Sequence, residues 1–246
     1  MSTQPTSAAD GLRREVAIGT VMLALGDSVA AGIGAPHVSE GCMAQLARHL
    51  GATRADLRFV NMAMPGESSR SMLVPGGQVD RAEALIAQTG AEGGQVAPIV
   101  LSIGGNDAME AQLLGDDEAL DELAANLQTI LSRLDSALHA QGGGLAGSAC
   151  LQTVYNPFEL AEGGDPGPGS VDADRLAPRR SRRGGHNRIL RAAAASFGIE
   201  VADVARAFRG RAAELTWVVS GDIHPRLTGH QAIADLYVEA CGWVPG

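Results

Sequence analysis

The sequence predicts an α/β domain in which helices cover both faces of a parallel β-sheet. Two observations lead to this prediction. Short aliphatic runs alternate along the chain with longer segments whose apolar residues recur at helical spacing. The first three aliphatic runs each give way to glycine and polar residues, which favour turns at the end of a buried strand.

Each predicted element has a recognisable pattern. Five segments have the short apolar character of strands: residues 19–26, 57–62, 98–103, 149–156 and 199–204. Five others are predicted helices: residues 40–50, 78–88, 117–139, 185–197 and 229–240. In the first helix, for example, Cys42, Leu46 and Leu50 fall on one side, and Gly51 provides a plausible stop.

The chain is expected to form one domain over residues 19–246, after a polar N-terminal tail of residues 1–18. A proline-rich, charged stretch at 157–185 is predicted to be a loop insertion that overhangs the strand ends. Arginines gather in its second half and in the helix that follows: Arg175, Arg179, Arg180, Arg182, Arg183, Arg188 and Arg191. They form either a solvated loop or a site for anionic groups.

The composition and net charge of the chain indicate which classes of protein it does not resemble. Apolar residues make up 45% and charged residues 19% of the chain, and the formal net charge of −9 argues against a nucleic-acid partner. No apolar stretch reaches the roughly 20 residues of a membrane span, so we expect a cytoplasmic protein. Cys42, Cys150 and Cys241 are too widely spaced for a zinc motif, so we expect free thiols and no metal. The sequence leaves the oligomeric state open.

Polar residues at three predicted strand ends should meet at one edge of the sheet, where parallel sheets bind ligands. They are Gly26-Asp27-Ser28, Pro65-Gly66-Glu67 and Gly104-Gly105-Asn106-Asp107. Ser28 is either a helix cap or a nucleophile, and a nucleophilic serine needs a base. Of the six histidines, His224 is the best candidate, because it lies just before the last helix with an aspartate nearby.

Four sequence blocks together resemble one enzyme family. "ALGDSVAAG", "AMPGESS", "SIGGND" and "GDIHPRLTGH" occur in the order and approximate spacing seen in GDSL-type esterases and lipases, the SGNH hydrolases. The resemblance spans residues from about 20 to about 240. It implies a flavodoxin-like three-layer α/β/α fold with five parallel strands. It also implies hydrolysis of esters or thioesters, with a small-molecule substrate and no cofactor.

The resemblance also implies roles for individual residues. Ser28 matches the family's nucleophile and His224 its base. The backbone N–H of Gly66 and the side-chain amide of Asn106 match the donors that join the Ser28 N–H in an oxyanion hole.

Three other residues of these sequence blocks are expected to have structural roles. Asp27 and Asp107 should position the turns at the strand ends, and His230 should belong to the last helix. Trp217 is expected to border the site, unless it packs under the loop.

The acid partner of His224 departs from the family pattern. The usual aspartate stands three residues before the histidine, where this chain has Gly221, and Asp222 stands two before it. A local turn could still bring Asp222 to the imidazole, which is the arrangement we predict. Otherwise a backbone carbonyl of Ser220 or Gly221 would orient His224 in a Ser–His dyad.

Other functional classes fit less well. The sequence has no GxSxG elbow, no GxxxxGK[ST] phosphate loop and no complete GxGxxG fingerprint. The alternative that remains is a catalytically inactive carbohydrate- or lipid-binding domain on the same fold.

Overall fold

The computed structural model describes residues 19–52, 54, 56–114, 117–158 and 185–242. The predicted tail (1–18) and most of the predicted loop insertion (159–184) lie outside these residues. Within them, five parallel strands form one sheet in the order β2-β1-β3-β4-β5. The strands are β1 (Thr20–Gly26), β2 (Arg58–Asn61), β3 (Gln95–Ser102), β4 (Ala149–Gln152) and β5 (Glu200–Ala202).

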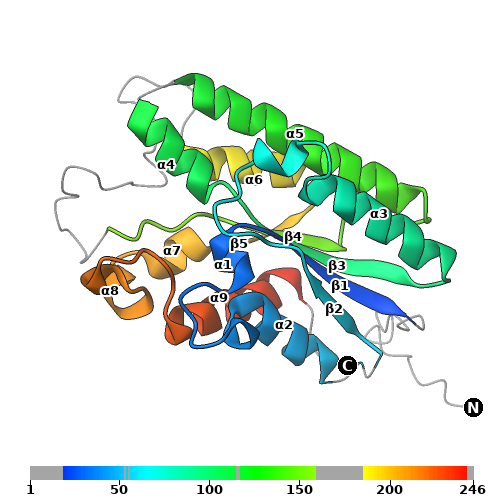
Figure 1. Cartoon of the computed structure of the whole chain (residues 1–246), viewed down its shortest axis with the longest axis horizontal. Helices are drawn as coiled ribbons and strands as arrows, with labels where there is room; N and C mark the ends of the chain where they lie inside the picture. The colour runs from blue at the N-terminus through cyan, green and yellow to red at the C-terminus, as the bar shows by residue number, and fades with distance from the viewer. Residues whose placement is uncertain (1–18, 53, 55, 115–116, 159–184, 243–246) are drawn as a thin grey trace, which may run out of the picture.

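Helices form a layer on each face of the sheet, as the alternating pattern predicts (Figure 1). One layer holds α3 (Gln78–Ala91), α4 (Gly105–Leu114), α5 (Asp117–His139) and α6 (His186–Ser196). The other holds α2 (Cys42–Gly51), α7 (Val204–Phe208), α8 (Ala212–Leu215) and α9 (Leu227–Cys241). The short helix α1 (Ser28–Ala31) and the 3₁₀ turns η1 (Val38–Glu40), η2 (Ser71–Leu73) and η3 (Val218–Ser220) complete the described elements.

Strand β1 is buried on both faces, which explains its uninterrupted apolar run. Val21, Leu23 and Leu25 pack with the layer that contains α3, α5 and α6. Met22 and Ala24 point the other way and pack with α2 and α9. The two-residue period of a strand thus divides one apolar run between two cores.

The structure differs from the predicted elements after strands β3 and β4. The helix α4 was not predicted, because the residues after β3 begin with glycines and lack a clear amphipathic pattern. Strand β4 ends at Gln152 rather than at residue 156. Beyond it, the backbone of Val154 pairs with the Asn187 carboxamide. The Val154 N–H donates to Asn187 Oδ1 at 2.8 Å, and the Val154 C=O accepts from Asn187 Nδ2 at 2.9 Å.

The turn after β1 is built around Gly26, which has a φ of +130°. A Cβ at this position would lie 1.9 Å from the carbonyl oxygen of Ser102, so β1 and β3 can approach only because residue 26 is glycine. The buried Gln78 carboxamide pairs with both the N–H and the C=O of Gly26, each at 2.8 Å. This contact ties α3 to the end of β1, and sequence patterns gave no sign of it.

Asp27 caps helix α1 from a buried position. Its carboxylate accepts hydrogen bonds from the Val29 N–H at 3.0 Å and from the Ser102 hydroxyl at 3.1 Å. Burial removes water from the charged form and raises the pKa of the Asp27 carboxyl from 3.8 to about 6. Asp27 therefore positions the turn, as expected, at a cost in stability when it is ionised.

We expect Gly26→Ala to destabilise the fold by more than about 4 kcal/mol, because the new methyl group would overlap backbone atoms of β3. Gly76→Ala is the matched control, since Gly76 also has a positive φ but has open space around it. That variant should lose only about 1–2 kcal/mol. Urea unfolding of both variants measures the difference, and equal losses would contradict the close approach at Gly26.

Asp27→Asn should alter how stability depends on pH. The raised pKa means that the folded protein binds the Asp27 proton more tightly than the unfolded chain does. Wild-type stability from this group is therefore full below about pH 4 and is lost as pH rises through about 6. The free energy of unfolding of the variant, relative to wild type, should increase by up to about 3 kcal/mol between pH 4 and pH 7.5.

Urea unfolding across this pH range tests the Asp27 prediction. Ser102→Ala, which removes a hydrogen-bond partner but keeps the carboxyl group, should retain the wild-type fall in stability. A difference between Asp27→Asn and wild type that stays constant with pH would show that Asp27 does not titrate in this range.

Candidate active site

The polar strand ends converge at one edge of the sheet, as the sequence predicts. Ser28 begins α1 directly after β1, and Asn106 lies in the first turn of α4 after β3. The loop after β2 joins them, because the Asn106 side-chain amide donates to the Glu67 carbonyl at 2.7 Å. Asp107 binds the same loop by accepting hydrogen bonds from the backbone and hydroxyl of Ser69. Asp107 thus holds loop and helix together, as expected.

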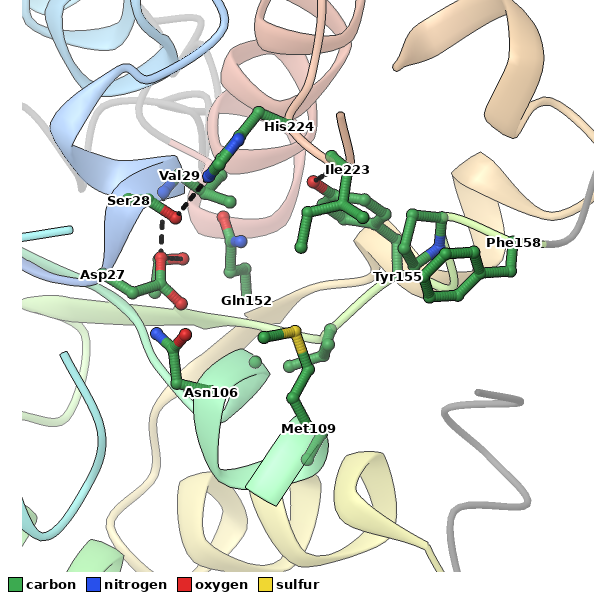
Figure 2. Close-up of a pocket in the computed structure, with 15 residues that line it drawn as sticks. Asp27, Ser28, Val29, Asn106, Met109, Gln152, Tyr155, Phe158, Ile223 and His224 are labelled. Carbon is green, nitrogen blue, oxygen red and sulfur yellow. Dashed lines mark hydrogen bonds between the residues drawn. The ribbon is translucent and has the colours of Figure 1, made fainter. Parts of the chain in front are cut away.

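Ser28 meets the predicted base. The distance between Ser28 Oγ and His224 Nε2 is 2.9 Å, although the two residues are 196 positions apart (Figure 2). On the other side of the ring, His224 Nδ1 lies 2.5 Å from Asp222 Oδ1. The structure therefore brings together Ser28, His224 and Asp222 in one hydrogen-bonded chain.

A tight turn allows Asp222 to reach the imidazole despite its displaced position. Gly221 follows η3 with a φ of +83°, and the N–H of Asp222 donates to the Trp217 carbonyl at 3.2 Å. Asp222 Oδ1 also accepts the backbone N–H of His224 at 3.0 Å. The hydrogen bonds from this N–H and from the imidazole hold the pKa of the Asp222 carboxyl below its usual range. The carboxylate is thus ionised while its side chain stays 49% exposed.

The loop that carries His224 is fixed by its neighbours. Tyr155, just after β4, donates its hydroxyl hydrogen to the Ile223 carbonyl at 2.8 Å. Thr216 and Pro225 form an antiparallel bridge that closes the base of the loop. Sequence reasoning missed this role of Tyr155, although an aromatic residue next to a predicted strand end was a visible signal.

His230 has a structural position, as expected. It is buried in α9, where Nδ1 accepts the Cys42 N–H at 3.2 Å and Nε2 faces the Ile33 carbonyl at 3.0 Å. Burial lowers the pKa of His230, so the ring is neutral and donates through Nε2. It links α9 to α2 and to the loop after α1.

The expected oxyanion donors come from three different segments. The Ser28 N–H belongs to the first residue of α1, where a helix leaves its N–H groups without intrahelical partners. Asn106 uses one N–H on Glu67 and has a second to donate. Gly66 is exposed in the loop after β2 with a φ of +83°, and it is not among the residues that line the adjoining pocket.

A mostly apolar pocket of about 70 Å³ adjoins Ser28 and His224 (Figure 2). Apart from Ser28 and His224, its lining residues are Asp27, Val29, Ser102, Gly105, Asn106, Ala108, Met109, Gln152, Val154, Tyr155, Pro157, Phe158 and Ile223. The aromatic part of the wall comes from Tyr155 and Phe158. Trp217, expected to border the site, instead donates its indole N–H to the Gly34 carbonyl at 2.8 Å and stacks under Arg226.

The described residues include only part of the arginine-rich region noted in the sequence. Of the seven arginines noted above, Arg188 is exposed on α6 and Arg191 pairs with Asp203 at 2.8 Å, while the other five lie outside the described residues. Within the described ranges, no three His, Cys, Asp or Glu side chains are grouped as ligands for a metal ion. No helix in that part of the chain has the length and apolar character to cross a bilayer.

Comparison with solved structures identifies proteins that share this architecture. One is LAE5, an α/β hydrolase enzyme from the metagenome of Lake Arreo, Spain (22% identity, TM-score 0.63, covering 94% of this chain and 98% of that chain). Another is the acetylxylan esterase Axe2 from Geobacillus stearothermophilus (20% identity, TM-score 0.62, covering 92% of this chain and 98% of that chain). A third is TesA (23% identity, TM-score 0.58, covering 89% of this chain and 97% of that chain). At these identities the likeness establishes the shared fold.

Comparison of the sequence itself identifies the family. No curated protein sequence matches significantly. Residues 24–232, however, match the GDSL-like lipase/acylhydrolase family, and this range includes all four sequence blocks and every residue of the Ser28–His224–Asp222 chain. The protein is therefore a member of the GDSL-like lipase/acylhydrolase family.

Proposed function

We propose that this protein is a serine esterase that hydrolyses carboxylic esters through an acyl-enzyme intermediate. The observation that carries the proposal is the continuous contact from Ser28 Oγ to His224 Nε2 and from His224 Nδ1 to Asp222, beside an apolar pocket. A binding domain without catalysis would not require a serine, a base and an acid in hydrogen-bond contact.

In the first step, Ser28 Oγ attacks the ester carbonyl carbon while its proton moves to His224 Nε2. Asp222 holds the Nδ1–H tautomer, so that Nε2 faces Ser28 with a free lone pair. The same carboxylate stabilises the positive imidazolium that forms. When the tetrahedral intermediate collapses, the C–O bond to the alcohol breaks and His224 gives its proton to the leaving oxygen.

The carbonyl oxygen becomes negative during this step and needs donors placed in advance. We assign this role to the N–H of Ser28, the N–H of Gly66 and the second side-chain N–H of Asn106. The contact from Asn106 to the Glu67 carbonyl supports the assignment, because it fixes the orientation of the amide. Gly66 can contribute through its backbone because it has no side chain to block the approach of a substrate.

Water then completes the reaction. His224 takes a proton from a water molecule, whose oxygen attacks the acyl carbon. The Ser28–acyl bond then breaks, His224 returns the proton to Ser28 Oγ, and the carboxylic acid is released. The same sequence of steps would cleave a thioester, with a thiol in place of the alcohol.

We further propose that the substrates have short acyl chains. The pocket is small, about 70 Å³, which limits the length of an acyl chain that it can hold. Its wall is largely apolar, which suits an alkyl group. The structural relative Axe2, an acetylxylan esterase, acts on an acyl group of this small size.

The first test is hydrolysis of p-nitrophenyl esters of increasing chain length, with acyl-CoA included for thioesters. Short esters should be cleaved fastest, and EDTA should not reduce the rate. Ser28→Ala should lower kcat by about 10⁴–10⁶, leaving the contribution of the oxyanion donors. Ser39→Ala, at an exposed serine that does not line the pocket, should keep wild-type rates.

A fluorophosphonate should label Ser28 covalently in the wild type and leave Ser28→Ala unlabelled. Absence of both labelling and hydrolysis in a folded wild-type protein would favour the inactive binding domain.

The second test concerns Asp222. Asp222→Asn should lower kcat by up to about 10⁴ with little change in KM, because the asparagine no longer fixes the tautomer or stabilises the imidazolium. Asp235→Asn, at an exposed position on α9, is the matched control and should not change kcat. A loss below about tenfold for Asp222→Asn would indicate a Ser–His dyad.

A further inference from the structure

The side chain of Gln152 lies in the pocket wall with an oxygen that has no partner. Gln152 is the last residue of β4 and is 3% exposed. Its Oε1 is buried and accepts no hydrogen bond from the described residues. Figure 2 shows the carboxamide among the pocket residues, in the region between His224 and Met109.

The neighbours of Gln152 in the pocket offer little to satisfy this oxygen. The hydroxyl groups that line the pocket have other partners. The Ser102 hydroxyl donates to Asp27, and the Ser28 hydroxyl faces His224 Nε2. The Tyr155 hydroxyl donates to the Ile223 carbonyl. A buried acceptor without a partner lowers the stability of the folded state, whereas leucine at the same position would avoid this cost. The carboxamide is therefore poorly explained as a packing residue.

Gln78 shows what a structural glutamine looks like in the same protein. It is equally buried, but its oxygen accepts the Gly26 N–H and its nitrogen donates to the Gly26 carbonyl and to Glu67. Gln152 has no comparable partner among the described residues, and it lies in the pocket rather than behind it. The contrast indicates that the partner of Gln152 is a bound molecule.

We propose that Gln152 is a specificity residue that selects esters whose acyl group carries a hydroxyl. This inference rests on the proposed esterase function. A hydroxyl can donate to Oε1 and accept from the amide nitrogen, and it adds little volume to a small acyl chain. It also brings no charge into a largely apolar pocket, where an ion would be costly.

The acyl half of the ester is the part that fits this location. The pocket is lined mainly by residues that follow β3 and β4, on the side of Ser28 away from β2. The alcohol must leave and be replaced by water during each cycle, so it takes the side open to solvent. The acyl group stays bound to Ser28 through both steps and can occupy the pocket beside Ser28.

The test compares esters that differ only in the hydroxyl group. The substrates are p-nitrophenyl butyrate, 2-hydroxybutyrate and 3-hydroxybutyrate, assayed with the wild type and Gln152→Leu. For at least one hydroxylated ester, the leucine variant should lower kcat/KM at least about tenfold relative to its effect on butyrate, the size expected for losing one buried hydrogen bond. Comparing ratios between variants cancels the intrinsic reactivity of each ester.

Met109→Leu is the matched control, since it alters the pocket wall without removing a hydrogen-bonding group. It should change kcat/KM for all three esters by a common factor. Gln152→Met, with an unbranched side chain of similar length, gives a second measurement if the leucine variant does not fold. Fluorophosphonate labelling of Ser28 verifies that each variant retains an intact site.

An equal effect of the Gln152 substitutions on all three esters would overturn the proposal while leaving the esterase function intact. Failure of the proposed function would look different, because the wild type would then neither hydrolyse butyrate nor accept the label.

Discussion

The position of Ser28 depends on the close approach of β1 and β3 at Gly26. The absent side chain of Gly26 lets its backbone lie against the Ser102 carbonyl, and the next residue, Asp27, binds the Ser102 hydroxyl. Gln78 secures the same point from α3 through two hydrogen bonds to Gly26. Three elements thus fix the direction in which the chain leaves β1, so that Ser28 enters α1 facing the pocket.

A second close backbone approach positions the loop that contains His224, the proposed base. Gly34, in the loop after α1, lies against the backbone of Pro225, where a Cβ would come within 2.3 Å of the Pro225 carbonyl oxygen. The Trp217 indole donates to the Gly34 carbonyl from the same side. The loop that contains His224 is therefore held against the segment that follows Ser28, and backbone contacts help to set the distance between these two side chains.

Much of this arrangement could be predicted from the sequence, because it depends on periodicity and strand order. The apolar runs identified all five strands, and the rule that strand ends meet at one edge brought Ser28, Gly66 and Asn106 into one region. The reach of Asp222 was harder to predict, since it depends on the backbone angle of Gly221 and on the turn after η3.

The contacts that sequence reasoning missed are of another kind. Gln78 and Tyr155 act through hydrogen bonds to backbone groups far away in the sequence, and no local pattern identifies those partners. The pairing of Asn187 with the backbone of Val154, at a position predicted to be strand, is a contact of the same kind. These contacts exist only when elements far apart in the sequence have packed, so they become visible only in the folded structure.

The separation of Ser28 and His224 along the chain has a consequence during protein synthesis. Ser28, the proposed nucleophile, directly follows the first strand, whereas His224, the proposed base, lies in the loop before α9, the last described helix. A ribosome-bound chain that has completed β1 to β5 would hold an unactivated serine at the edge of its sheet. If Ser28 and His224 act as proposed, the reactive pair forms only after the loop before α9 has packed, so chemical reactivity appears late in folding.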